Sequence, residues 1–259
     1  FLIQLGEKYL FLLEKLKSYF KIGYISKVSS NSYYYGVSSI SDLNDVIISH
    51  FLNYPLLTNK QADFKLFKLV IDLINLKEHL TTEGIKKIVS IRASLNTGLP
   101  NTLKLDFPDI IPFPRQSPIG SELTTHFEIN WVVGFVDGES CFSIDIYKDK
   151  TKTGFTPKFT FQITQHARDT VLMEMFIKYF NCGRLKIETN AVRFTVSNFK
   201  DLDLKIIPFF NNFPLVGSKF WNFKDFCKAA DIMRVKGHLT LNGLEEIKLI
   251  KAGMNTGRK

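Results

Sequence analysis

Residues 131–140 read Trp-Val-Val-Gly-Phe-Val-Asp-Gly-Glu-Ser, an apolar run that ends on two carboxylates. The run predicts a short helix over 131–137, followed directly by a strand. Glycine inside a helix costs about 1 kcal/mol relative to alanine, and Gly134 offsets that cost if a second helix approaches closely there. Gly138 and Glu139 then place a carbonyl and a carboxylate at the negative end of the helix dipole, where these hard oxygen ligands suit magnesium. The alternative is an ordinary helix-ending turn with a solvent-exposed glutamate.

The rest of the chain is an internal repeat in which this stretch has no partner. The element that ends at Lys60 returns at Lys219, and the shift of 219 − 60 = 159 residues also relates two His-Leu-Thr and two Asn-Thr-Gly elements. Near the amino terminus the shift is 160, since Phe1 matches Phe161. A counterpart of Glu139 would lie at 139 − 160 = −21, before residue 1. We therefore expect two related lobes, of which the first lacks the segment that carries the acidic site.

Composition supports two packed lobes and a linker. An apolar content of 45% in 259 residues is enough for two globular cores. The first lobe is expected at 1–98 and the second at 121–259. Between them, residues 99–120 carry five prolines, a density that predicts an extended linker without a regular helix.

Charge and cysteine usage narrow the class of protein. The net charge of +9 and the pI of about 9.3 favour polyanionic partners. The sequence has no uncharged apolar run of eighteen residues, so no membrane span is expected. Cys141, Cys182 and Cys227 are too few and too widely spaced for a zinc site or a disulfide framework. The abundance of Phe, Ile, Lys, Asn and Tyr is typical of an organellar or other AT-rich genome.

Residues 131–142 resemble the LAGLIDADG motif of homing endonucleases, with Gly134, Asp137 and Glu139 at its glycine and its two acidic positions. The resemblance continues through the repeated elements over essentially the whole chain, and it is to the single-chain, two-repeat fungal mitochondrial group. It implies an α+β fold of two pseudo-symmetric lobes. Each lobe would have a curved antiparallel sheet that forms a nucleic-acid saddle, with helices behind it and the first lobe truncated. It also implies a mitochondrial location.

The same resemblance assigns roles to five residues. Glu139 matches the metal-binding acid, the carbonyl of Gly138 is a further ligand, and the implied cofactor is Mg²⁺. Lys60 and Lys219 match the basic residues that flank the scissile phosphates, and Gln162 is a polar residue near the site. The alternatives are surface charges for the two lysines and a solvent-facing strand position for Gln162.

Nucleic-acid contacts are expected from alternate residues on the strands, because a two-stranded ribbon fits the major groove and reaches base edges. The alternation could also be the solvated face of any sheet. In the second lobe the candidates are Ser143, Asp145, Tyr147, Lys158, Thr160, Gln162, Arg184, Lys186, Arg193 and Thr195, and in the first lobe they are Tyr24, Ser26, Tyr33 and Tyr35.

The activity implied by the resemblance is magnesium-dependent, sequence-specific cleavage of both DNA strands, which needs an acid from each of two motifs. We expect this chain, with one of the two acids, to bind nucleic acid and not to cleave both strands by itself. Three arrangements remain open. The first motif could belong to a segment outside this chain, or a separate fragment could supply it and cover the exposed edge of the first lobe. Alternatively, the chain could be an RNA-binding derivative, as an intron maturase or a mitochondrial ribosome component.

Overall fold

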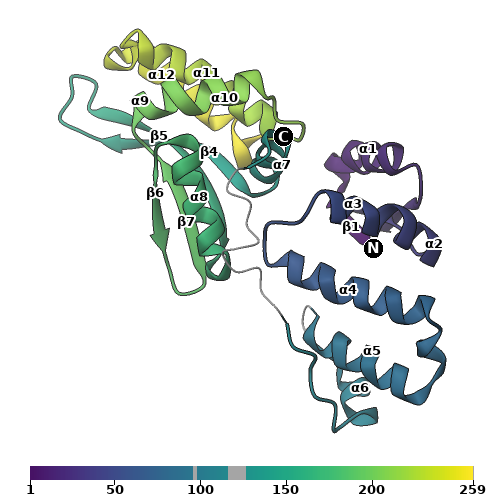
Figure 1. Ribbon diagram of the computed structural model, residues 1–259. Coiled ribbons are helices and arrows are strands. Elements are labelled where there is room, and N and C mark those ends of the chain that lie inside the picture. The colour runs from purple at the N-terminus through teal and green to yellow at the C-terminus, as the bar shows by residue number, and fades with distance from the viewer. Residues whose placement is uncertain (96–97, 116–126, 259) are drawn as a thin grey trace. The chain divides into compact units, whose positions relative to one another are not determined.

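The structure, a computed structural model, describes residues 1–95, 98–115 and 127–258. The chain divides into two compact units, Phe1–Leu123 and Thr124–Lys259, which we call the first and second lobes (Figure 1). The predicted α+β organisation with antiparallel sheets is confirmed. In the described part of the chain, no helix has both the length and the apolar character that a membrane crossing requires.

The second lobe has a four-stranded antiparallel sheet in the order β4-β5-β7-β6. Successive side chains alternate between the two faces of a strand, and Phe142, Phe161 and Phe194 are buried on one face. The alternating burial leaves the opposite face half-exposed or exposed. The strands are β4 (Ser140–Lys148), β5 (Phe155–His166), β6 (Arg184–Ile187) and β7 (Ala191–Val196).

Helices pack on one face of this sheet, and Figure 1 shows α8 lying against it. The Phe142 ring lies 5.2 Å from Phe223 of α11, and the Phe194 ring lies 5.9 Å from Phe176 of α8, so one core joins sheet and helices. The helices are α7 (Ile129–Glu139), α8 (Thr170–Phe180), α9 (Phe199–Asp201), α10 (Ile207–Asn212), α11 (Lys219–Arg234) and α12 (Leu241–Ala252), with the π-helical segment η5 (Leu202–Ile206) and the short 3₁₀ helices η4 (Ala167–Asp169), η6 (Gly237–Leu239) and η7 (Asn255–Gly257).

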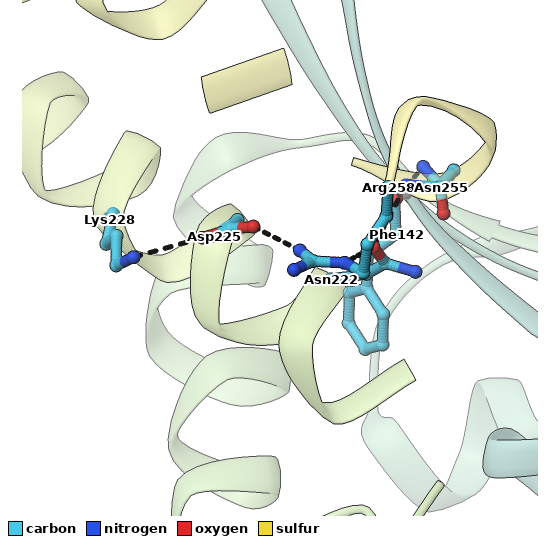
Figure 2. Close-up of polar contacts among 6 residues, drawn as sticks. All are labelled: Phe142, Asn222, Asp225, Lys228, Asn255 and Arg258. Atoms are coloured by element: carbon cyan, nitrogen blue, oxygen red, sulfur yellow. Dashed lines mark hydrogen bonds and ion pairs between the residues drawn. The ribbon is translucent and has the colours of Figure 1, made fainter. Parts of the chain in front are cut away.

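A polar network fastens the carboxyl-terminal turn η7 to the start of β4 (Figure 2). The buried Asn222 side-chain oxygen accepts from the backbone N–H of Asn255 at 2.9 Å and from Arg258 Nε at 3.2 Å. Asn255 Nδ2 donates to the Phe142 carbonyl at 2.9 Å, and Arg258 pairs with Asp225. Buried polar groups are costly unless they are hydrogen-bonded, and this network satisfies Asn222 while it holds the first residues of β4.

The first lobe repeats this plan with a three-stranded sheet in the order β1-β3-β2, which corresponds to β5-β7-β6 of the second lobe. Its described residues contain no counterpart of α7 or β4. The elements are β1 (Leu2–Gly6), η1 (Glu7–Tyr9), α1 (Leu10–Phe20), β2 (Tyr24–Ser29), β3 (Ser32–Gly36), α2 (Ile40–Asp42), η2 (Leu43–Ile48), α3 (Ser49–Asn53), α4 (Lys60–Asn75), η3 (Glu78–Leu80), α5 (Thr82–Ser94) and α6 (Asn101–Asp106).

The core of the first lobe corrects two predicted contact residues. Tyr35 is 0% exposed, and its hydroxyl donates to the Ile22 carbonyl at 3.1 Å. Tyr33 packs against the same core, so the prediction that Tyr33 and Tyr35 face nucleic acid is wrong. Tyr34 takes the open face instead, with its ring 5.9 Å from that of Tyr24. Three consecutive tyrosines show no alternation of polarity, and a slip of one residue turns every side chain to the other face.

The prediction that residues 99–120 contain no regular helix is also wrong, because α6 forms within them. The prolines leave a proline-free stretch between Pro100 and Pro108, which is long enough for a short helix. Pro100 stands at the N-cap of α6, where the N–H that proline lacks is not needed. Residues 116–120 of the predicted linker lie outside the described residues.

The segment after α6 packs back on its own lobe. The backbone N–H of Phe113 donates to the Ser90 carbonyl of α5 at 3.0 Å. Arg115 lies 3.2 Å from Asp63 of α4 and donates to the Asn59 carbonyl at 3.2 Å. Residues up to Arg115 therefore belong to the first lobe, although the sequence predicted a free linker from residue 99.

The tyrosine assignment predicts a difference in stability between two neighbouring substitutions. Tyr35→Ala should destabilise the first lobe by about 3–5 kcal/mol, because it empties a buried aromatic site. Tyr34→Ala removes a side chain from the open face and should cost about 1 kcal/mol or less. Urea unfolding of the two variants checks this, and equal costs would contradict the assignment.

Candidate functional site

Helix α7 runs directly into strand β4, and Glu139 is the last residue of the helix. The helix extends two residues further at each end than the predicted 131–137. Ser140 is buried, and its hydroxyl donates at 2.6 Å to the Val136 carbonyl, which also accepts the backbone N–H of Ser140. The Glu139 side chain is exposed and makes no hydrogen bond or ion pair with the described residues of its lobe. It is available to a ligand.

Asp137, two residues before Glu139, is engaged within the lobe. Its Oδ2 accepts the backbone N–H of Val216 at 2.8 Å and that of Gly217 at 2.5 Å, in the loop that leads into α11. A Cβ atom at Gly217 would lie 2.7 Å from Asp137 Oδ1, so a larger residue there would force the carboxylate to shift. The two carboxylates of the motif therefore differ in their surroundings: Asp137 contacts a backbone loop, whereas Glu139 is exposed.

Lys219, the first residue of α11, reaches the carboxyl end of α7. Its ammonium donates to the Asp137 carbonyl at 2.8 Å and to the Gly138 carbonyl at 2.7 Å. A cation at this end of a helix is stabilised by the helix dipole. The structure thus brings together three of the predicted site residues, Glu139, Gly138 and Lys219.

The donor atoms fit the predicted metal ion in part. The Glu139 carboxylate is a hard ligand suited to a divalent cation. The Gly138 carbonyl, also predicted as a ligand, already accepts a hydrogen bond from Lys219, so a metal ion there would share this oxygen with the ammonium. Among the described residues there is no group of three or more His, Cys, Asp or Glu side chains that could hold a metal. Water or ligand oxygens would have to complete the coordination.

Lys60 and Gln162, the other two predicted site residues, lie on different elements. Lys60 is exposed and begins α4, as Lys219 begins α11. Gln162 is half-buried on β5 opposite Cys141 of β4, and its Nε2 donates to Thr164 Oγ1 at 3.0 Å. Gln162 therefore lies one strand away from the residues that directly follow Glu139.

The predicted contact residues of the second lobe lie on the sheet face opposite the phenylalanine core. Ser143 pairs with Thr160 and Asp145 with Lys158 across β4 and β5. The pair between them, Ile144 and Phe159, is buried on the other face. The other members of this open face are Tyr147, Gln162, Arg184, Lys186, Arg193 and Thr195. In the first lobe, Tyr24 and Ser26 share the open face with Tyr34.

Two cations of the open face share an acidic neighbour. Lys186 Nζ lies 3.0 Å from one Glu188 carboxylate oxygen, and an Arg193 guanidinium nitrogen lies 3.5 Å from the other. The hydrogen bond from Lys186 and the charge of Arg193 hold the pKa of Glu188 below its usual value. Arg193 Nε is buried and has no hydrogen-bond partner among the described residues.

Cys141 lies where the acidic site meets the open face. Burial raises the pKa of its thiol, and the positive charge of Lys219 acts against that increase. Its Sγ also lies 3.9 Å from Asn255 Oδ1. The pKa of the Cys141 thiol therefore depends on burial first, and on the charges of Lys219 and Asp145.

Sequence reasoning missed the contact of Asp137 with the loop before α11. The sequence did carry a signal, since the repeated element has Gly217 where the first lobe has Thr58 (217 − 159 = 58). A glycine that replaces a larger residue in one copy of a repeat indicates a close approach in that copy. The partner in that approach could not be read from the repeat.

A sequence profile described as LAGLIDADG endonuclease matches residues 1–71 and 132–230. The chain belongs to the LAGLIDADG endonuclease family. The probable intron-encoded endonuclease 2 of Neurospora crassa is 40% identical to this LAGLIDADG chain over 97% of the chain and 57% of the relative's own length. The probable intron-encoded endonuclease 3 of the same fungus is 38% identical over 83% of the chain and 40% of its length. The chain thus spans about half the length of these relatives.

Solved structures of LAGLIDADG endonucleases match the fold. The I-SmaMI LAGLIDADG homing endonuclease bound to cleaved DNA is 41% identical with a TM-score of 0.94, over 100% of this chain and 86% of that chain. The I-LtrWI LAGLIDADG homing endonuclease bound to target DNA is 39% identical with a TM-score of 0.94, over 100% and 87%. I-SmaMI bound to uncleaved DNA target in the presence of calcium ions is 41% identical with a TM-score of 0.92, over 98% and 87%.

Further I-SmaMI structures contain variants in which one or both of two lysines are replaced by alanine. These two lysines are 159 positions apart in I-SmaMI. In this LAGLIDADG chain, Lys60 and Lys219 are separated by the same 219 − 60 = 159 positions.

The local electrostatics predict an effect of Lys219 on the chemistry of Cys141. Lys219→Met removes the positive charge, so the pKa of the Cys141 thiol should rise further and alkylation by iodoacetamide at pH 8 should slow. Mass spectrometry of each cysteine measures the rate. Cys182 is the internal control, since the cation that affects its thiol is Lys205. An unchanged rate at Cys141 would show that Lys219 lies elsewhere.

Proposed function

We propose that this chain forms the DNA-binding surface and one metal-holding acid of a homing endonuclease, whose whole activity is magnesium-dependent cleavage of both strands of a specific duplex. The observation that carries the proposal is Glu139. It is an exposed carboxylate at the end of α7, beside Lys219 and next to the open face of the sheet. The DNA-bound structures of I-SmaMI and I-LtrWI support DNA as the ligand.

Each site residue has a proposed part in phosphodiester hydrolysis. Glu139 holds the Mg²⁺ ion, which when bound activates the attacking water and stabilises the leaving oxygen. Lys219 sets a positive charge at the same helix end, where it meets the phosphate. Lys60 is proposed to do the same from the first lobe, and the equal spacing of the two lysines varied in I-SmaMI supports this pairing. Gln162 orients groups near the site from the neighbouring strand.

The open faces of the two sheets are proposed to lie along the duplex. Positively charged side chains contact phosphates, and hydroxyl, carboxylate and aromatic groups reach base edges in the major groove. The proposed phosphate contacts are Lys158, Arg184, Lys186 and Arg193, and the proposed base contacts are Ser143, Asp145, Tyr147, Thr160, Thr195, Tyr24, Ser26 and Tyr34.

The open face predicts which surface cations contribute to binding. Arg184→Ala should weaken binding of duplex DNA and reduce the slope of log affinity against log salt by about 0.9, the value for one phosphate contact. Lys178→Ala is the matched control, because Lys178 is exposed on α8, which packs on the opposite face of the sheet. Salt titrations of both variants provide the test. Equal losses would mean that binding follows net charge and not this face.

We further propose that the 259-residue polypeptide alone binds DNA without cutting both strands. Its described residues include one exposed acid at a LAGLIDADG helix end, and each strand needs its own acid. A second motif would come from a segment outside this chain or from a separate fragment, which could also pair with the edge strand β1.

A cleavage assay tests this second proposal directly. Duplexes bound in Ca²⁺ are selected from a random library and then incubated with Mg²⁺. The polypeptide should leave the selected duplexes uncut, with no shorter double-stranded fragments. Glu139→Gln should bind these duplexes with an affinity similar to that of the parent. Magnesium-dependent double-strand breaks by the polypeptide alone would refute the proposal. A preference for structured RNA over these duplexes at equal salt would favour an RNA-binding derivative, as an intron maturase or ribosome component.

We also propose a mitochondrial origin for the gene. The composition is typical of AT-rich codons. Relatives include a protein in ND4 intron 1 of Podospora anserina, 51% identical over 27% of this chain, and a cox1 intron-2 protein of Schizosaccharomyces pombe, 25% identical over 72%. Fractionation of the source organism into mitochondrial and nuclear DNA would test where the gene lies. A gene copy in the nuclear DNA would contradict the proposal.

A further inference from the structure

We propose that Asp137 is a positioning residue, whose carboxylate fixes the start of α11 and thereby holds Lys219 beside Glu139. The inference rests on the proposed function, in which Lys219 contacts a phosphate. Asp137 Oδ2 accepts both backbone N–H groups, so the part proposed for Asp137 is to hold this turn and not to bind the metal ion or DNA.

The contacts between α7 and α11 run in both directions. The Asp137 carboxylate accepts from Val216 and Gly217, just before α11 begins at Lys219. The Lys219 ammonium returns to the carbonyls of Asp137 and Gly138. We call this set of four hydrogen bonds the α7–α11 latch. Both pairs of hydrogen bonds involve Asp137, and their partners on the other side all lie at the start of α11. Loss of the Asp137 carboxylate therefore frees the segment that carries Lys219.

The helix dipoles favour the same arrangement. The Asp137 carboxylate lies at the amino end of α11, where the dipole is positive, and the Lys219 ammonium lies at the carboxyl end of α7, where the dipole is negative. Each charge therefore sits at the helix end of opposite sign. The latch holds the Lys219 ammonium on the carbonyl of Gly138, the residue directly before the exposed Glu139.

The first lobe shows how the same helix start is built without this carboxylate. At the equivalent position it has Thr58, whose hydroxyl accepts the backbone N–H of Lys60 at 3.3 Å. The second lobe has Gly217 there, and a Cβ would collide with Asp137 Oδ1. The backbone of Gly217 is not in the left-handed region, so it is the contact with Asp137 that excludes a side chain.

Crystal structures of two variants test the latch without reference to DNA. Asp137→Ala removes the Oδ2 atom that accepts both N–H groups, and the Lys219 ammonium should leave the Gly138 carbonyl. Asp137→Asn keeps a side-chain oxygen that accepts the same N–H groups, and Lys219 should stay in place. If Lys219 remains on the Gly138 carbonyl in Asp137→Ala, or leaves it in Asp137→Asn, the proposal is overturned.

A pair of substitutions tests the fit between Asp137 and Gly217. Gly217→Ala alone should lower the thermal stability of the chain, since the new methyl meets the carboxylate. In the Asp137→Ala background the obstacle is absent, so Gly217→Ala should cause little further loss. Additive losses in the double variant would show that another contact excludes the methyl, and would count against the latch.

The salt dependence of DNA binding connects the latch to function. On a duplex selected in Ca²⁺, Lys219→Met should reduce the salt slope by about 0.9. Asp137→Ala should reduce it equally, Asp137→Asn should restore the parent slope, and the double variant Asp137→Ala with Lys219→Met should lose no more than either single variant. Additive reductions would overturn the positioning role.

The salt titrations and the crystal structures together separate the phosphate role of Lys219 from the positioning role of Asp137. If Lys219→Met leaves the salt slope unchanged, the phosphate role of Lys219 under the proposed function fails. The crystal structures still decide whether Asp137 holds Lys219. If the slope falls for Lys219→Met and not for Asp137→Ala, the proposed function stands and the positioning role of Asp137 is wrong.

Discussion

The absence of a loop between α7 and β4 is the constraint on which the second lobe depends. Glu139 ends the helix and Ser140 begins the strand, so the chain changes from a period of 3.6 residues to a period of 2 within one peptide bond. The buried hydroxyl of Ser140 completes the helix end. From that residue on, Phe142 must point into the core, and the register with β5 fixes the open face. The same junction leaves the Glu139 carboxylate at the rim of that face.

Much of this could be read from the sequence, and the failures have a common physical cause. The repeat predicted two lobes, and alternation in β4 and β5 placed Ser143 and Thr160 on the open face, because phenylalanines alternate with polar residues there. Tyr33 and Tyr35 were misplaced where three tyrosines in a row remove that contrast. Local pattern decides a face only where polarity alternates.

Long-range contacts were beyond the sequence for a different reason. Asp137 and Gly217 are 80 residues apart, and neither residue type indicates the other as its partner. The motif predicted two acids and a carbonyl at the end of a helix, but the commitment of Asp137 to a backbone loop and of the Gly138 carbonyl to Lys219 follows from tertiary packing. A motif names the residue types at a site, whereas the fold decides which of their atoms remain available.

The two copies of the repeat differ at one equivalent position on α11 and α4, where a polar side chain binds the segment that ends each lobe. In the second lobe Asn222 accepts hydrogen bonds from Asn255 of η7 and from Arg258. In the first lobe the equivalent residue, Asp63 (222 − 159 = 63), forms an ion pair with Arg115. An exchange of lobes between relatives to build chimeric nucleases should therefore place the fusion point after Arg115. A crossover at residue 99, where the repeat ends, would separate Asp63 from its counter-ion and leave a half-buried acid unpaired in the grafted half.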